Sequence, residues 1–213
     1  MAPDGLAVRT PPIVAILRGI RPGEVAAIAQ ALLAAGIRIM EVPQNAAGAH
    51  ASLAELVSAA GEQALVGAGT ILDAAAVDAA AGAGARFVVA PNTRPDVIER
   101  ALALGVEPMP GVLTPTEAFA ALAAGARDLK LFPAAAAGLP HLAALGEVLP
   151  PQCRVWAVGG VGSHNLGEWL AAGARGVAVG SALYRPGRAP DEVRSRAAAL
   201  VASFERAAGA APA

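Results

Sequence analysis

The chain has 213 residues, of which 55% are hydrophobic and only 3% aromatic, and 16 basic residues balance 17 acidic ones. This length can bury a large core, and the balanced charge gives no reason to expect a nucleic-acid or anionic-membrane partner. No segment supplies the roughly 18 to 20 unbroken apolar residues of a membrane-spanning helix. Residues 1–12 lack the regions of a signal peptide, and the only cysteine, Cys153, excludes an intrachain disulfide and indicates a reducing cytoplasm.

Short runs of β-branched and aliphatic residues recur along the chain and predict eight strands, which begin near Ile13, Ile37, Ala64, Arg86, Val106, Arg127, Arg154 and Arg175. Successive starts lie 20 to 27 residues apart, about the length of one strand, one helix and two loops. Alanine-rich segments between them, such as 24–35, 95–104 and 115–124, have helical spacing. Most of these segments end at a glycine suited to a left-handed C-cap, at Gly36, Gly84, Gly105, Gly125 and Gly173.

Eight strands that alternate with eight helices predict an α/β fold, a (β/α)8 TIM barrel. We expect one domain over residues 1–213, with short flexible ends at about 1–11 and 207–213. A doubly wound open sheet is the alternative, because it is built from the same repeating unit. The last repeat resembles the others and no strand looks like an antiparallel edge, which favours the barrel.

Charged residues follow or end the first two predicted strands. Arg18 closes the first and can bind a carboxylate or phosphate bidentately, although a surface arginine after a strand is common. Glu41 shares a strand face with Ile39, so we expect it to point into the barrel near the carboxyl ends of the strands. A buried carboxylate there has a raised pKa and can transfer protons. The alternative is a structural ion pair of Glu41 with Lys130 or Arg18.

The third predicted strand ends in the sequence GAGT at 67–70. It is not a dinucleotide fingerprint, because Leu72 stands where the third glycine belongs. Thr70 is better placed to bond a small carboxylate. We expect no metal site, because the three histidines lack the paired spacing of metal ligands, at His50, His141 and His164.

Lys130 is the only lysine in the chain, and the other basic residues are all arginine. It lies in the sixth predicted strand, where alternation directs its side chain toward the barrel axis. Burial lowers the pKa of an unpaired ammonium, and a free amine can attack a ketone. The alternative is that the chain uses arginine in place of lysine throughout, and that the one remaining lysine has no special role. Its place on an apolar strand favours the chemical role, because a lysine is costly to bury.

Glycine-containing turns follow the last two predicted strands, with the sequences VGGV at 158–161 and VGS at 179–181. In many barrels these two loops bind phosphate through backbone N–H groups and a nearby helix N-terminus. Glycine lets the backbone approach the anion, and Ser181 can donate its hydroxyl. Simple turn glycines are the alternative, but two such turns at neighbouring strand ends indicate a phosphate site.

Seven motifs, in this order, resemble the KDPG/KDPGal aldolase family over about residues 12–207: AILRGI at 15–20, EVP at 41–43, VGAGT at 66–70, APN at 90–92, LKLFP at 129–133, AVGGV at 157–161 and GSALY at 180–184. The resemblance implies a homotrimeric barrel without metal or organic cofactor. It also implies cleavage of a phosphorylated 2-keto-3-deoxy sugar acid to pyruvate and glyceraldehyde 3-phosphate.

The resemblance also assigns roles to individual residues. Lys130 falls on the Schiff-base lysine and Glu41 on the acid/base glutamate. The remaining matches fall on substrate-binding positions, at Arg18, Thr70 and Pro91, and on phosphate-side positions, at Val158, Gly159, Gly160, Gly180 and Ser181.

Fewer residues support a prediction of the configuration of the substrate at C4. Asn45 stands where gluconate-type members carry an arginine, and Arg18 followed by Gly19 resembles the galactonate type, whereas Gln44 departs from the aliphatic residue of that type. We expect the galactonate epimer, with the gluconate epimer or dual specificity as the alternative. A phosphate-binding barrel isomerase or synthase and a non-catalytic sugar-phosphate sensor are more distant alternatives.

Overall fold

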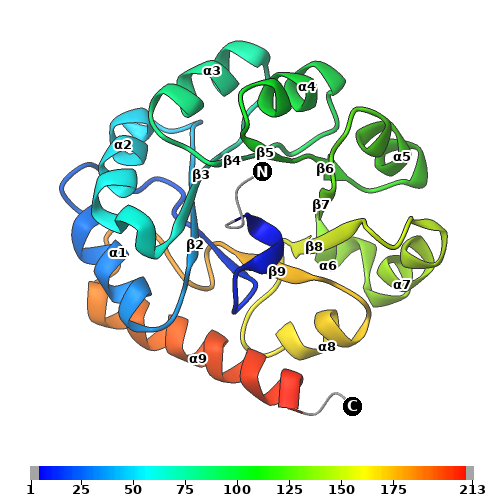
Figure 1. Cartoon of the computed structure of the whole chain (residues 1–213). Coiled ribbons are helices and arrows are strands. Elements are labelled where there is room, and N and C mark those ends of the chain that lie inside the picture. Colours follow the sequence, from blue (N-terminus) through cyan, green and yellow to red (C-terminus); the bar gives the residue numbers. More distant parts are fainter. Residues whose placement is uncertain (1–4, 210–213) are drawn as a thin grey trace.

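The computed structural model describes residues 5–209, in which parallel strands curl into a nearly closed barrel enclosed by helices (Figure 1). The nine strands of this part of the chain are β1 (Ile13–Ile16), β2 (Ile39–Pro43), β3 (Leu65–Gly69), β4 (Phe87–Val89), β5 (Glu107–Met109), β6 (Gly111–Val112), β7 (Asp128–Leu131), β8 (Arg154–Val158) and β9 (Gly176–Val179). Every pairing is parallel, in the order β5-β4-β3-β2-β1-β9-β8-β7-β6. The predicted barrel is confirmed against the open doubly wound sheet.

The predicted count of eight strands differs from the structure because Pro110 divides the fifth predicted strand. β5 pairs only with β4 and β6 only with β7, so these two strands stand at the two ends of the sheet order. Proline has no N–H to donate to a ladder, but the carbonyl of Pro110 still accepts from the backbone N–H of Lys130 at 2.9 Å. The gap in the nearly closed barrel, here called the seam, therefore lies at Pro110 between β5 and β6. β6 is paired with β7, the strand that carries Lys130.

Helices cover the outside of the barrel, and their bounds are α1 (Val25–Ala34), α2 (Ala49–Ala60), α3 (Ala74–Gly82), α4 (Pro95–Ala103), α5 (Pro115–Ala123), α6 (Ala134–Ala137), α7 (Leu139–Val148), α8 (Leu166–Ala171) and α9 (Pro190–Gly209). The five predicted C-cap glycines all have positive φ. Thr114 begins α5 with a capping box to Glu117, which satisfies backbone N–H groups at the helix start. Within residues 5–209, no helix is both long and apolar enough to span a membrane.

The barrel interior is filled by a core of its own, separate from the larger core between sheet and helices. Its largest side chains are Phe87 and Trp156, each of which lies over a glycine of a neighbouring strand. A Cβ on Gly67 would lie 2.5 Å from the Phe87 ring, and one on Gly176 would lie 2.5 Å from the Trp156 ring. A chain with few aromatic residues thus uses two of them, opposite glycines, to pack the interior.

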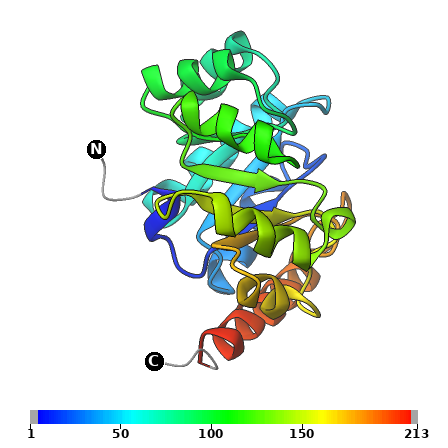
Figure 2. The ribbon, with the colours of Figure 1, turned by 90° about the vertical axis from the view of Figure 1, so that its right-hand side faces the viewer.

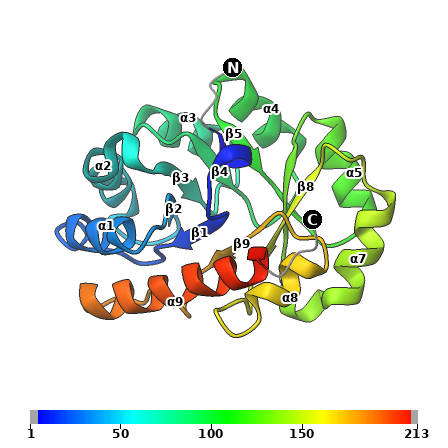
Figure 3. The same cartoon turned by 60° about the horizontal axis from the view of Figure 1, so that its bottom comes forward.

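Part of the amino-terminal end expected to be flexible, residues 1–11, lies in the described part of the chain. A 3-10 helix, η1 (Leu6–Val8), lies across one end of the barrel (Figure 2). Leu6 is 0% exposed within the inner core, and its backbone N–H donates to Glu107 Oε2 at 3.0 Å. At the other end of the chain, residues 207–209 belong to α9, which passes beside α1 and α8 (Figure 3). Residues 1–4 and 210–213, the remaining parts of the expected flexible ends, lie outside the described residues.

Candidate active site

The predicted site residues share one end of the barrel. All strands are parallel, so their carboxyl ends point the same way. Glu41 and Lys130 lie within β2 and β7, and the other predicted residues lie at, or just after, the ends of their strands: Arg18 after β1, Thr70 after β3, Pro91 after β4, Val158 with Gly159 and Gly160 at the end of β8, and Gly180 with Ser181 after β9. The topology brings every one of them to the end opposite η1.

Glu41 and Lys130 are buried ionisable side chains of the barrel interior, 3% and 8% exposed. Glu41 shares a face of β2 with Ile39, which belongs to the inner core. Lys130 pairs in register with Trp156, another inner-core residue, so the two side chains point to the same side of the sheet. The apolar neighbours on these strands therefore hold both charged groups away from solvent.

Burial changes the pKa of both groups in opposite directions. It raises the pKa of Glu41 to about 7, although the positive charges of Lys130 and Arg18 act against the rise. It lowers the pKa of Lys130, and the positive charge of Arg18 lowers it further, while the charge of Glu41 opposes the change. The site therefore holds a carboxyl group that can gain and lose a proton near neutral pH, beside an amine that loses its proton more readily than a surface lysine.

The Glu41 carboxylate has free space beside it, and one of its oxygen atoms accepts no hydrogen bond from residues 5–209. Its Oε2 atom is buried without a hydrogen-bond partner among the described residues. Gly69 on β3 leaves the room for it, because a Cβ there would lie 2.6 Å from that oxygen. The structural ion pair considered from the sequence is not formed within the described part of the chain, where Glu41 interacts with Lys130 and Arg18 only through longer-range charge. A buried acceptor left unpaired is costly, so it points to a group that a ligand would satisfy.

Two contacts at this end of the barrel involve residues that the sequence did not assign to the site by pattern. The Nζ atom of Lys130 lies 4.5 Å from the centroid of the Phe132 ring, a favourable contact for a cation. The Nη1 atom of Arg18 donates to Asn45 Oδ1 at 2.7 Å. Strand alternation could have indicated Phe132, which shares a face with Lys130. No local pattern indicates the pair of Arg18 with Asn45, because 27 residues separate them.

Thr70 is the one non-glycine residue with positive φ among residues 5–209, at 58°. A β-branched side chain is strained in this left-handed region, and such strain concentrates at functional sites. The preceding carbonyl, of Gly69, accepts from the backbone N–H of Gln44 at 2.8 Å, which fixes the chain next to β2. The strained residue thus follows directly on the glycine that makes room for Glu41.

Pro91 lies in a loop that presses against the seam of the barrel. A Cβ on Gly111 would lie 2.3 Å from the Pro91 carbonyl group, so only glycine allows this approach. Gly111 is in turn the register partner of Lys130. Pro91 therefore lies against β6, the strand next to the one that carries Lys130.

The two glycine turns lie side by side because β8 and β9 are paired. Gly159 and Gly160 have φ of 97° and 78°, and a Cβ on Gly160 would lie 2.4 Å from that of Ala135. Asn165 fixes the first turn, since it accepts from the Gly162 N–H at 2.9 Å and donates to the Gly160 carbonyl at 3.0 Å. In the second turn, the Gly180 carbonyl accepts from two N–H groups further along the chain.

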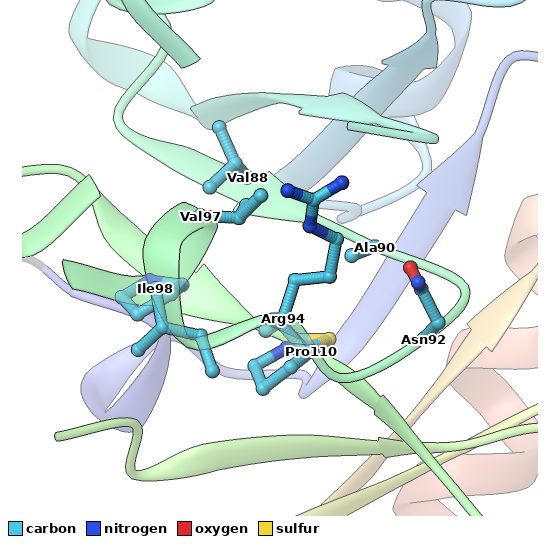
Figure 4. Close-up of a pocket in the computed structure, with 9 residues that line it drawn as sticks. Val88, Ala90, Asn92, Arg94, Val97, Ile98 and Pro110 are labelled. Atoms are coloured by element: carbon cyan, nitrogen blue, oxygen red, sulfur yellow. The ribbon is translucent and has the colours of Figure 1, made fainter. Parts of the chain in front are cut away.

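A small cavity elsewhere can be set aside as the place of chemistry. It lies between β4, β5 and α4, lined by Val88, Ala90 and Val97 among others (Figure 4). Its volume of about 10 Å³ is barely enough for one water molecule. It contains neither Lys130 nor Glu41, so the candidate site is defined by those two residues and the strand ends around them.

A family model described as the KDPG and KHG aldolases matches residues 6–194. The chain belongs to this aldolase family. It is 44% identical, over 92% of its length and 96% of the relative's, to 2-dehydro-3-deoxy-6-phosphogalactonate aldolase of Escherichia coli (strain K12). A solved structure described as native KDPGal has a TM-score of 0.92 and 43% identity, and covers 94% of this chain and 98% of its own. The 2-dehydro-3-deoxy-phosphogluconate aldolase of Treponema pallidum (strain Nichols) is 36% identical over 68% of each chain.

The comparisons confirm the resemblance inferred from the seven sequence motifs, and they identify the protein as a lyase, since an aldolase cleaves a carbon–carbon bond. They leave the roles of single residues to be tested.

Glu41→Gln should remove a pH dependence from the stability of this aldolase. The pKa of Glu41 is raised from 4.5 to about 7, so the folded protein keeps a proton that the unfolded chain has released. The wild type therefore loses about 2–3 kcal/mol of its free energy of unfolding as pH rises between these two values, and the variant does not. Urea unfolding of both proteins from pH 5 to 8 measures the difference. A difference that stays constant over this range would show that Glu41 titrates as an exposed carboxyl group.

Proposed function

We propose that this protein is a class I aldolase that cleaves 2-dehydro-3-deoxy-6-phosphogalactonate to pyruvate and D-glyceraldehyde 3-phosphate. One observation carries the proposal: the only lysine of the chain is buried inside the barrel, with its pKa lowered, in the electrostatic field of a protonatable glutamate. An amine in this state can attack a ketone, whereas an arginine stays protonated. We propose the following course from the positions of these groups.

Lys130 attacks the C2 ketone of the substrate. The new bond joins Nζ to C2, the ketone oxygen leaves as water, and a protonated imine remains. This cation withdraws electrons, so the C3–C4 bond can break with its electron pair moving into an enamine. The aldehyde that forms at C4 carries the phosphate away from the lysine.

Glu41 moves the protons. As the C3–C4 bond breaks, the C4 hydroxyl loses its proton to the carboxylate, directly or through water. The same group then returns a proton to C3 of the enamine, and hydrolysis of the imine releases pyruvate. A pKa near 7 suits both directions of transfer, and the unpaired Oε2 atom is free to accept.

The remaining site residues bind the two ends of the substrate in this proposal. Arg18, Thr70 and Pro91 surround the carboxylate end, where the hydroxyl of Thr70 donates to it. The phosphate lies on the turns after β8 and β9, at Val158, Gly159, Gly160, Gly180 and Ser181. Anchoring both ends aligns the breaking bond with the imine and the carboxylate.

The sequence identity and coverage of the relatives favour the galactonate configuration of the substrate. Two relatives named for the galactonate substrate match at 44% over 92% and 42% over 91% of this chain, whereas two relatives named for the gluconate substrate match at 36% over 68% and 33% over 85%. The contact of Arg18 with Asn45 adds a structural reason, because an arginine at position 45 would replace an acceptor by a like charge beside Arg18.

Borohydride reduction in the presence of pyruvate tests the imine. The wild type should gain the mass of one reduced pyruvyl group on the peptide that contains Lys130, and Lys130→Ala should gain none there and lose turnover. Reduction without pyruvate is the control for nonspecific labelling, and circular dichroism checks the fold of the variant. An adduct confined to the N-terminal amine, or full activity in Lys130→Ala, would contradict the proposed chemistry.

The two C4 epimers, assayed side by side for pyruvate release, test the substrate. We expect the galactonate epimer to have the higher kcat/KM, and Asn45→Arg to lower that value by about tenfold or more, because a second positive charge displaces Arg18. Asn45→Asp, which keeps an acceptor for Arg18, is the matched control. A higher kcat/KM for the gluconate epimer would reassign the substrate and leave the imine chemistry untouched.

A homotrimer is also part of the proposal, with exposed apolar side chains such as Phe119 on α5 available for contact between copies. The cytoplasmic location expected from the single cysteine is proposed with it. Light scattering should give a mass of about 63 kDa, three times the 21.0 kDa of one chain. A mass of one or two chains at micromolar concentration would rule the trimer out.

A further inference from the structure

Three arginine side chains converge on the backbone carbonyls of the turn after β9. Arg185 Nε donates to the Ser181 carbonyl at 3.2 Å. Arg188 Nη1 donates to the Ser181 and Leu183 carbonyls at 3.3 and 2.8 Å. Arg196 Nη1 donates to the Ala182 carbonyl at 3.2 Å. Three successive carbonyls of one turn thus accept from guanidinium groups that belong to the segment between the turn and α9 and to α9 itself.

Arg188 is the centre of this arrangement. Its side chain is only 11% exposed, and its Nε atom forms an ion pair with Glu192 at 3.1 Å. The same carboxylate oxygen accepts from Arg196 Nε at 2.9 Å. Glu192 therefore orients two of the three guanidinium groups. A buried cation with this number of partners holds a defined geometry, because any movement would leave a charged group without its hydrogen bonds.

One side of the turn faces a hollow. A hollow of about 330 Å³ lies between the turn, the loop that follows β8 and the first half of α9. Ala182 lines it from the turn, His164 from the loop, and Arg196 from the helix. The arginine hydrogen bonds therefore act on a side of the turn where side-chain packing is incomplete, whereas Leu183 and Tyr184 anchor the turn in the core on its other side.

The arginines also change the electrostatics of the turn. A carbonyl that accepts from a cation polarises its peptide group, which makes the attached N–H a stronger donor. The peptide groups concerned carry the N–H groups of Ala182, Leu183 and Tyr184. The last two donate to the Gly180 carbonyl at 2.8 and 2.9 Å, so the arginines strengthen the hydrogen bonds that close the turn. Three guanidinium groups against the single carboxylate of Glu192 leave a local excess of positive charge beside Gly180 and Ser181. The excess charge would favour an anion bound to the inner side of the turn, without contact between the anion and any of the arginines.

We propose that Arg188 and Arg196 are positioning residues, which hold the turn of residues 180–183 in the shape that binds the substrate phosphate. The inference rests on the proposed function, since that function assigns the phosphate to this turn. It goes further in placing part of the phosphate affinity in side chains behind the turn that never contact the substrate.

Arg188→Met and Arg196→Met test this inference, with Arg194→Met as the matched control. Arg194 lies on the same helix and forms an ion pair with Asp191 at 3.1 Å, away from the turn carbonyls. Two readouts depend on phosphate: KM for the phosphorylated substrate, and the affinity for inorganic phosphate from ³¹P NMR titration. One does not: the exchange of pyruvate methyl hydrogens for deuterium, which needs only Lys130 and Glu41.

We expect Arg188→Met to raise KM and weaken phosphate binding by about tenfold, the effect of losing one hydrogen bond to a charged group. Arg196→Met, at a more exposed position, should show a smaller change in the same direction. Deuterium exchange and kcat should stay within about twofold of the wild type, and Arg194→Met should match the wild type throughout. Arg188→Lys, which retains the charge but not the two-carbonyl geometry, should recover part of the affinity.

Unchanged phosphate affinity in both methionine variants would overturn the inference, as would a loss of deuterium exchange equal to the loss of phosphate affinity. If Arg188→Met does not fold, as judged by circular dichroism, Arg196→Met and Arg188→Lys give the same comparison. A wild type that binds phosphate but exchanges no pyruvate hydrogens would count against the proposed function instead. The phosphate titration needs no turnover and still decides the inference in that case.

Discussion

The free-energy cost of burying charged groups determines the protonation behaviour of the two ionisable residues at the centre of this barrel. An ammonium and a carboxyl group are buried near one another without a direct ion pair in the described part of the chain, and burial brings their pKa values toward each other. The carboxyl group is thereby able to change its protonation state near neutrality, and the ammonium loses its proton more readily than it would on the surface. The apolar strands that exclude water are therefore part of the chemistry, and the glycines that leave space beside Glu41 and Phe87 are what allow those strands to be filled so closely.

Strand periodicity was sufficient to predict the most important features of the site. Alternation along 39–43 and 128–132 directs Glu41 and Lys130 inward, because the intervening residues are apolar and face the helices. A single lysine in a chain rich in arginine drew attention to the same position. The order of strands and helices predicted a parallel barrel, and parallel strands bring their carboxyl ends together, so residues far apart in the sequence could be assigned to one site.

Features that depend on contacts between distant segments could not be predicted in this way. The interruption at Pro110 depends on which neighbour each half-strand pairs with, and the run that begins at Val106 shows only one continuous apolar pattern. Leu6 looks like an isolated apolar residue in a terminal segment, and its burial is decided by the closed barrel beneath it. The pairing of Arg18 with Asn45 and the strained backbone of Thr70 likewise arise from the way neighbouring loops meet.

The closure of one end of the barrel by η1 determines how substrate and products enter and leave. Because Leu6 seals the interior against Phe87 and Trp156, substrate and both products must use the opposite end. In the proposed chemistry the aldehyde departs first, because pyruvate stays bonded to Lys130 until the imine is hydrolysed. The two products therefore leave in turn through one opening, and the covalently held product leaves last.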